Sequence, residues 1–360
     1  MRKPSEHRLL KLRGAYYKIS QLTDEEKSRG VIACSAGNHA QGVALGASRN
    51  GIKSIICLPA GAPVSKVEAT KGYGAEVCLV PGVYDDAYAK AVELRDANGY
   101  TFVHPFDDEK VIAGQGTIGL EIIEDMPEVE AVIVPIGGGG LISGVAFAIK
   151  QLRPDVKVYG VQSEGAPSMF NSLKEGKRIH LDSVKTIADG IAVKEPGENT
   201  FRMISEYVDE VVTVSEDEIA AAILALMEQK KLVSEGAGAV AVAAAMFNKV
   251  PIKGKNVVCV VSGGNIDVTA HNRAVRRGLV KAGRDAALIL DLQDKPGQLA
   301  GVLNIVSEQG GNVVSIVHER NTDSTDVNAC MLHLELETRD HDHIRAIKDA
   351  LKKAGYVIIK

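Results

Sequence analysis

The chain has 360 residues, which is enough for two or three domains with buried cores. Hydrophobic residues make up 45% of it and charged residues 24%, a composition typical of globular proteins in water. The formal net charge of −4 provides no basic field, so nucleic acid and anionic membranes are disfavoured as main partners.

Glycines interrupt the apolar runs, so we expect no membrane span, and no secretory leader pattern is visible at the start. The five cysteines include no CxxC pair. We therefore expect reduced core thiols in a cytoplasmic protein, without a disulfide framework or a metal cluster. The cysteines are Cys34, Cys57, Cys78, Cys259 and Cys330.

From Gly30 to about Gly263, short apolar strands alternate with stretches of helical period. The expected strands, rich in Val and Ile, are GVIACS, KSIICLPA, AEVCLVPG, TFVHPF, AVIVPIGG, VKVYGVQS and NVVCVVSGG. Helical stretches such as QGVALGASRNG and AYAKAVELRDANG lie between them. The alternation predicts a doubly wound α/β region with a mostly parallel sheet, which binds ligands at the carboxyl ends of its strands.

The first candidate binding loop is CSAGNHAQG, which follows the strand GVIA. We expect a helix to start near Gln41, and amides at a helix N-terminus favour an anion such as a carboxylate. The side-chain amide of Asn38 can hydrogen-bond a phenolate or carboxylate oxygen. A plain strand-to-helix turn capped by Asn38 is the structural alternative.

The second loop is PIGGGGLISG, in which four glycines allow the backbone to approach a phosphate closely. A dinucleotide site is the rival interpretation. Gly138, Gly140 and Ser143 approximate a GxGxxG spacing, and Glu164 ends the next strand, where a ribose-binding acid could stand. The match is imperfect because the third small residue is serine.

The third loop is VVSGGNID, with Ser262 at the end of a strand. A hydroxyl can hydrogen-bond a ring nitrogen without bringing a charge. The alternative is a turn with a serine-to-backbone hydrogen bond.

The pattern of expected strands and helices changes after Asp267. AHNRAVRRGLVKAGR is a basic connector of helical period, and from Ala287 the pattern is β-α-β-β-α-β, a ferredoxin-like split unit. We therefore divide the chain into a first domain over residues 1–270, a helical linker over 271–286 and a second domain over 287–360.

The three loops, in this order and each after a strand, resemble the fold-type-II pyridoxal-phosphate enzymes, a two-lobed, tryptophan synthase β-like fold. SAGNHAQG, GGGGL, SGGN, TIADGIAV and HPFDD are most similar to threonine dehydratases, and the resemblance runs from about Lys11 to Asn265. The tail resembles an ACT domain, whose DxPGxL signature is present as Asp294, Pro296, Gly297 and Leu299.

The resemblance implies a role for each motif. Lys11 would form the Schiff base with pyridoxal phosphate, Asn38 would bind the ring oxygen and Ser262 the ring nitrogen. The phosphate would be held by Gly137, Gly138, Gly139, Gly140 and Leu141. The substrate carboxylate would be held by the loop of Ser35, Ala36, Gly37, Asn38 and His39. An effector amino acid would be bound near Asp294, Gly297 and Leu299.

The implied reaction is the conversion of L-threonine into 2-oxobutanoate and ammonia, and of L-serine into pyruvate. The Lys11 amine would remove the α-proton, and the neutral Ser262 would favour rapid loss of the β-hydroxyl over reprotonation. Serine racemases are similar but carry a second serine where this chain has Ala36. Their metal-ligand acids fall on Gln162 and Ser168, so we expect elimination rather than racemisation, and no divalent metal site.

The beginning of the chain departs from the family pattern. Family members carry Thr-Gly-Ser-Phe or a variant before the lysine, whereas residues 7–10 here read HRLL. We therefore expect a truncated or frameshifted start. An inactive homologue that binds amino acids, and a nucleotide-dependent oxidoreductase, remain as alternatives.

The tail implies regulation by an amino acid, with isoleucine or valine as expected effectors, although a dimerisation module alone is possible. The family suggests a homotetramer or dimer.

Overall fold

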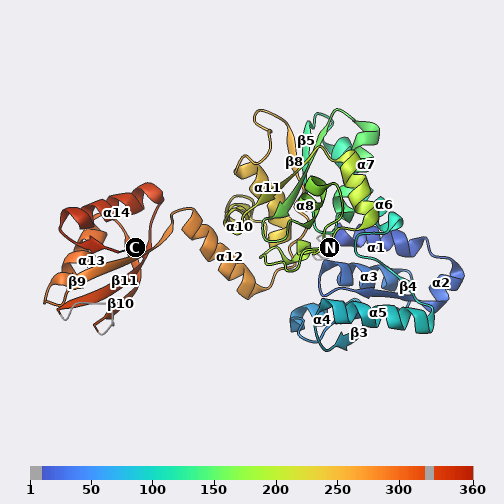
Figure 1. Cartoon of the computed structure of the whole chain (residues 1–360), viewed down its shortest axis with the longest axis horizontal. Coiled ribbons are helices and arrows are strands. Elements are labelled where there is room, and N and C mark those ends of the chain that lie inside the picture. Colours follow the sequence, from blue (N-terminus) through green and yellow to red (C-terminus); the bar gives the residue numbers. More distant parts are fainter. Residues whose placement is uncertain (1–9, 321–327, 360) are drawn as a thin grey trace. The chain divides into compact units, whose positions relative to one another are not determined.

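The computed structural model describes residues 10–320 and 328–359, which divide into two compact units with the boundary between His271 and Asn272 (Figure 1). The segment expected to replace the family's Thr-Gly-Ser-Phe lies outside the described residues, except for Leu10. Across the described part of the chain, no helix is both long and apolar enough to cross a membrane.

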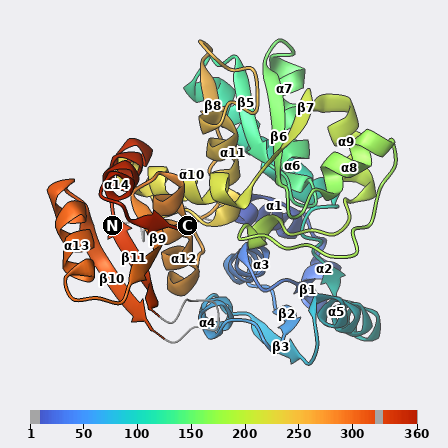
Figure 2. The same ribbon diagram turned by 60° about the vertical axis from the view of Figure 1, so that its left-hand side comes forward.

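The first unit contains two four-stranded parallel sheets, one in each lobe (Figure 2). The first sheet has the order β3-β2-β1-β4, with Cys34 opposite Cys57 in neighbouring strands. Its strands are β1 (Val31–Cys34), β2 (Ser54–Pro59), β3 (Glu76–Val80) and β4 (Thr101–Phe102). The helices of this half are α1 (Leu10–Ser20), α2 (Asp24–Arg29), α3 (Asn38–Arg49), α4 (Val64–Gly72) and α5 (Tyr84–Asn98).

Both faces of the first sheet are covered. Val31 and Ala33 belong to a core cluster with residues of α1 and α3, whereas Ile32 and Cys34 belong to a cluster with residues of α5. Successive side chains of a strand point to opposite faces, so a strand buried on both faces is a continuous apolar run. This is why VIAC is apolar at every position.

The second sheet has the order β7-β6-β5-β8. Its strands are β5 (Ala131–Pro135), β6 (Lys157–Ser163), β7 (Glu210–Val214) and β8 (Val257–Cys259). The helices of this half are α6 (Glu109–Asp125), α7 (Gly140–Leu152), α8 (Ser168–Glu175), the 3-10 turn η2 (Asp189–Ile191), α9 (Glu198–Tyr207), α10 (Glu216–Lys230) and α11 (Gly236–Met246).

Strand β7 was missing from the sequence prediction. Its segment EVVTV is only partly buried, with Val211 and Val214 inside and Glu210 exposed, so it is not the continuous apolar run of its neighbours. The start of α3 was also predicted too late. The helix begins at Asn38 rather than near Gln41, directly after the cap residue Gly37.

The second unit is a β-α-β-β-α-β fold with an antiparallel sheet in the order β10-β11-β9-β12. It begins within α12 (Val268–Lys281) and continues with β9 (Asp285–Gln293), α13 (Gln298–Glu308), β10 (Asn312–Glu319), β11 (Ala329–Glu337), α14 (His341–Lys353) and β12 (Val357–Ile358). Alternate leucines of β9 and β11 are buried in one cluster with residues of α13 and α14. The ferredoxin-like topology predicted from the sequence is thus confirmed.

Candidate active site

A cavity of about 890 Å³ in the first unit is lined by the residues predicted to bind cofactor and substrate. Residues from both lobes contribute, and several groups of them follow the carboxyl ends of β1, β4, β5 and β8. The predicted residues that line it are Lys11, Ser35, Ala36, Gly37, Asn38, His39, Gly137, Gly138, Gly139, Gly140, Leu141 and Ser262.

Lys11 stands in the first turn of α1, and its Nζ donates a hydrogen bond to the Pro105 carbonyl at 2.9 Å. Burial lowers the pKa of Lys11 to about 8, although the negative charge of Glu235 acts in the opposite direction. A buried amine with such a pKa is available as a neutral nucleophile or base near neutral pH.

Asn38 opens α3 and points its side chain across the cavity. Its Nδ2 donates to Oε1 of Glu235 at 2.7 Å, while its buried Oδ1 has no hydrogen-bond partner in the described part of the chain. Ser35 stabilises the same loop, because its Oγ accepts a hydrogen bond from the Gly37 amide at 3.1 Å.

His39 lines the cavity, but its ring is engaged with the protein. Its Nε2 lies 2.8 Å from the Val103 carbonyl oxygen. Burial, followed by the charge of Lys11, lowers the pKa of His39 to about 3, so the ring is neutral. The loop can therefore offer a carboxylate its backbone amides, but no imidazolium charge.

The glycine loop follows β5 and forms the N-terminus of α7. Gly139 has a φ of 103°, the left-handed region that favours glycine, and Gly140 is the first helical residue. A Cβ at Gly138 would overlap the Phe106 ring, and a Cβ at Gly140 would lie 2.7 Å from the Phe106 carbonyl oxygen. The glycines thus allow the backbone to pack against Phe106 while the first amides of α7 lack intrahelical acceptors.

Ser262 follows β8, and its Oγ donates to the Ala237 carbonyl at 3.3 Å. Ser262 lines the cavity and brings no formal charge to it. The hydroxyl can therefore still take part in a further hydrogen bond.

Glu235 was not predicted from the sequence, although it occupies the centre of the hydrogen-bond network. It is buried at the N-cap position of α11, and its Oε2 accepts a hydrogen bond from the Asn265 amide at 3.1 Å. Burial is the main cause that raises the pKa of Glu235 to about 7, and the charge of Asp189 adds to it. The only local sign is an acid directly before the small apolar helix GAGAVAVAAAM.

Two further charged residues of the cavity, Lys66 and Asp189, act on Glu235. Lys66 and Asp189 both line the cavity and form an ion pair of 2.9 Å. The Lys66 charge lowers the pKa of Glu235 and so partly offsets Asp189.

The dinucleotide interpretation fails on the placement of its residues. Ser143 is fully buried within α7, and neither it nor Glu164 is among the residues that line the cavity. Glu164, the acid that this interpretation requires, therefore does not share the cavity with the glycine loop.

Gln162 and Ser168 lie in the core of the second lobe. The Gln162 amide donates to the Ile136 carbonyl at 3.3 Å and accepts from the Phe170 amide at 2.8 Å, so both ends of the side chain are used. Ser168 is also fully buried.

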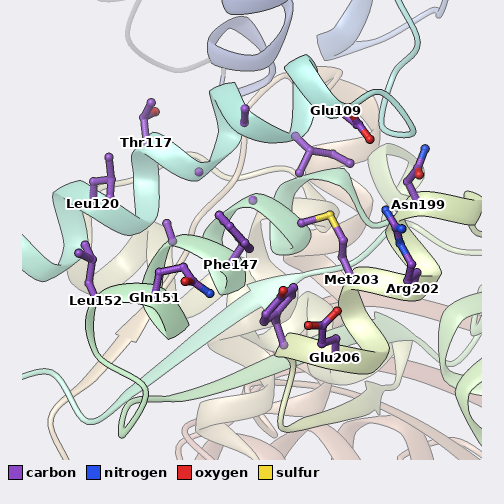
Figure 3. A pocket seen from close by; sticks show the side chains of 16 residues that line it. Glu109, Thr117, Leu120, Phe147, Gln151, Leu152, Asn199, Arg202, Met203 and Glu206 are labelled. Carbon is purple, nitrogen blue, oxygen red and sulfur yellow. The ribbon is translucent and has the colours of Figure 1, made fainter.

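A different hollow of about 670 Å³ lies among α6, α7 and α9 (Figure 3). Thr117 and Leu120 of α6, Phe147 of α7 and Met203 of α9 line it (Figure 3). It contains none of the predicted site residues and its lining is mainly apolar, so we do not assign the reaction to it.

The predicted effector residues lie in the second unit. Asp294 is exposed in the loop after β9, Gly297 caps α13 with a φ of 92°, and the half-buried Leu299 packs against the core of that unit. Arg320 of the same unit forms an ion pair of 3.3 Å with Asp294.

Comparison with known proteins places this geometry in a family. Residues 10–263 match the family model described as pyridoxal-phosphate dependent enzyme, and residues 286–355 match the ACT domain. The L-threonine ammonia-lyase of Thermotoga maritima is 52% identical over 348 residues, which cover 97% of this chain and 86% of that protein.

Two solved structures resemble the first unit. The processed form of threonine deaminase isoform 2 from Solanum lycopersicum has a TM-score of 0.72 and 43% identity, over 75% of this chain and 79% of that one. Maize serine racemase has a TM-score of 0.71 and 36% identity, and the match covers 76% of this chain and 84% of that one. The chain belongs to the pyridoxal-phosphate dependent enzymes of fold type II and carries a C-terminal ACT domain.

Proposed function

We propose that the chain is a threonine ammonia-lyase, which converts L-threonine into 2-oxobutanoate and ammonia, and L-serine into pyruvate and ammonia. The observation that carries the proposal is the convergence of Lys11, Asn38, Ser262 and the glycine loop on one cavity, from segments far apart in the sequence. The relative with 52% identity, named for this reaction, supports it.

The side chains of the cavity fit pyridoxal phosphate. The α7 N-terminus with its four glycines suits a phosphate, and Lys11 supplies a buried amine for the aldehyde. Asn38 has a second amide hydrogen for the ring oxygen, and its unpartnered Oδ1 is a buried polar atom that a bound molecule would satisfy. Bound pyridoxal phosphate supplies delocalisation of the electron pair that remains when the α-proton leaves.

Lys11 works first as the amine that holds the cofactor and then as the base. With substrate bound, the Lys11 Nζ would be free to accept the α-proton. The pKa of about 8 keeps a usable fraction of the amine neutral at physiological pH, and the Pro105 carbonyl can accept a hydrogen from Nζ once it is protonated.

Ser262 decides what happens after proton removal. The Ser262 hydroxyl brings no charge, so it would not favour the build-up of negative charge on a bound cofactor. The β-hydroxyl would leave as water, and the proton added to it balances the α-proton that Lys11 takes up. The remaining amino-acid skeleton then takes up water and releases ammonia, which gives the 2-oxo acid. The overall reaction consumes L-threonine and yields 2-oxobutanoate and ammonia.

Racemisation is the second candidate, because maize serine racemase has 36% identity and a TM-score of 0.71. Reprotonation on the opposite face of the α-carbon needs a proton donor there. Ala36 lines the cavity, and its methyl group cannot transfer a proton. We therefore favour elimination.

The second unit is proposed to regulate the first. In this proposal residues 1–270 form the catalytic domain, 271–286 a linker and 287–360 a regulatory domain that binds an amino acid such as isoleucine or valine. The enzyme works in the cytoplasm as a homotetramer or dimer.

The test is 2-oxobutanoate formation by the purified chain with L-threonine and pyridoxal phosphate. Lys11→Ala is expected to abolish it. Lys18→Ala is the matched control on the same helix, since Lys18 pairs with Asp108 at 2.8 Å and does not line the cavity. A chain that turns yellow with the cofactor but forms no product would be the inactive amino-acid-binding homologue. A chain that neither binds the cofactor nor forms product would overturn the proposal.

A further inference from the structure

Three side chains with different metal-binding groups meet at one end of the sheet in the second unit. Asp294 follows β9, His318 belongs to β10 and Cys330 to β11. One ligand atom from each lies within 4.8 Å of the other two. We propose that Asp294, His318 and Cys330 bind a transition-metal ion of the zinc type, independently of the reaction in the first unit.

The pleat of the sheet explains why the three side chains meet. His318 is opposite Leu332, and Cys330 is opposite Leu292. Cys330 precedes Leu332 by two residues, and Asp294 follows Leu292 by two, so strand periodicity puts all three on the face of the buried leucines. The Asp294 amide donates to the Asn328 carbonyl at 2.8 Å, which holds the loop against the start of β11.

The three ligand atoms lie close enough together to share one ion. His318 Nε2 and Cys330 Sγ are 2.9 Å apart. The bond lengths of zinc to nitrogen, oxygen and sulfur place neighbouring ligand atoms about 3.4–3.6 Å apart in a tetrahedron. Binding of such an ion would therefore move His318 Nε2 and Cys330 Sγ apart by roughly 0.5–0.7 Å. Without an ion, the His318 ring nitrogen and the Cys330 thiol form a hydrogen bond, and Sγ also donates to the Leu292 carbonyl at 3.5 Å.

The ligand types select the metal. Thiolate and imidazole together favour zinc and related transition metals, whereas magnesium and calcium prefer oxygen ligands alone. Three protein ligands leave the fourth position for water or an exogenous molecule, as in open zinc sites.

The electrostatic surroundings also favour a cation. The Asp294 carboxylate places a negative charge beside the nitrogen and sulfur ligand atoms. Arg320 is the competing cation, since it pairs with Asp294. Its side chain is 65% exposed, so the pair is weakly held, and one carboxylate oxygen remains for a metal.

The test uses the full-length holoenzyme, first treated with a chelator and then titrated with Co²⁺ alone. Cobalt bound to a thiolate has a near-ultraviolet charge-transfer band, and a tetrahedral site adds visible d–d bands, both read as difference spectra. We expect saturation at one cobalt per chain, and displacement by Zn²⁺. Absence of the charge-transfer band at excess Co²⁺ would overturn the proposal and leave a His318–Cys330 hydrogen bond.

Variants assign the signal to these residues. Cys330→Ser and His318→Gln should remove the thiolate band or weaken cobalt binding by more than the roughly 10- to 100-fold that loss of an outer-shell partner causes. Since Cys330 is buried and His318 exposed, His318→Gln keeps the test valid if Cys330→Ser does not fold.

The matched controls are Cys78→Ser in the first unit and His333→Gln on the other face of β11, and both should keep the band. A band that persists in Cys330→Ser would reject the site. Threonine turnover in the same samples is a separate readout, so failure of the metal site and failure of the proposed reaction are distinguishable.

Discussion

Lys11 and Glu235 give the cavity two buried groups whose pKa values lie close to neutral pH. Burial lowers that of Lys11 to about 8 and raises that of Glu235 to about 7. Burial disfavours the charged form of each, while the charge of Glu235 favours the ammonium form of Lys11. The pair can therefore change its charge within the range in which the enzyme is proposed to work.

The rate of cofactor binding should depend on the protonation state of Lys11. Only the neutral amine attacks an aldehyde, so the rate at which cofactor-free protein binds pyridoxal phosphate should rise with pH through about 8 and then level off. Glu235→Gln removes the charge that raises the pKa of Lys11, so the midpoint should move to lower pH. Stopped-flow absorbance of the bound cofactor measures this.

The control is Glu164→Gln, an exposed acid that does not line the cavity. Glu164→Gln should not change the midpoint pH of the cofactor-binding rate. A midpoint that rises in Glu235→Gln would contradict the assigned electrostatic role of Glu235.

His39 should make the first unit sensitive to acid. Its pKa is lowered from 6.5 to about 3 in the folded state, so the unfolded chain binds the proton more readily and stability falls as the pH drops below 6.5. Between pH 6.5 and 5 the loss from this residue is about 2 kcal/mol. Urea unfolding over this range measures it.

His39→Gln should flatten that part of the pH profile. His180→Gln is the comparison, because the His180 side chain is 58% exposed. Equal slopes for the wild type and His39→Gln would show that other groups cause the acid sensitivity.

At the scale of elements, helices α6 and α7 pack closely against each other at positions where both carry glycine. A Cβ at Gly144 would overlap the Ile112 carbonyl oxygen and lie 2.6 Å from the Gly116 amide nitrogen. A Cβ at Gly119 would lie 2.8 Å from the Val145 carbonyl oxygen. The helix that begins with the glycine loop is thereby held backbone to backbone against α6, which fixes the N-terminus of α7.

Gly144→Ala should therefore destabilise the first unit. Overpacking costs about 1–3 kcal/mol, and the better helix propensity of alanine returns at most about 1 kcal/mol. Cofactor affinity should fall as well, because α7 would shift. Gly72→Ala, at the end of α4 with no atom within 4 Å of the added Cβ, should be neutral or stabilising. Equal unfolding midpoints for the two variants would refute the close crossing.

At the scale of the whole molecule, the proposed effector must prefer one conformational state of the enzyme in order to control it. Isoleucine or valine should change threonine turnover by about 5-fold or more, the usual range of allosteric coupling. Gly297→Val should keep turnover without effector but weaken the response, because a branched residue is strained at a φ of 92°.

Gly355→Val is the matched control, since Gly355 has a φ of 91° in the same unit but stands between α14 and β12. It should retain the response. If neither amino acid alters turnover or produces binding heat with the full chain, the second unit is not a sensor of these effectors.

Much of the fold was predictable, because buried parallel strands are short apolar runs and helices repeat every 3.6 residues. The half-exposed β7 was missed for the same reason, since it lacks that pattern. The division into two separate sheets was implied by the family resemblance and not by periodicity. Strand patterns carry no information on which strands pair.

The sequence by itself determined the strand-end loops that line the cavity, because glycines, strand ends and helix starts are local features set by short-range sterics. Only the tertiary structure brought Glu235 to Asn38, 197 residues away, and Cys330 to His318 and Asp294. It alone decided the pKa values of Lys11, Glu235 and His39, because desolvation depends on everything that folds around a side chain. Local order is encoded in neighbouring residues, whereas burial and charge proximity arise only when distant segments pack.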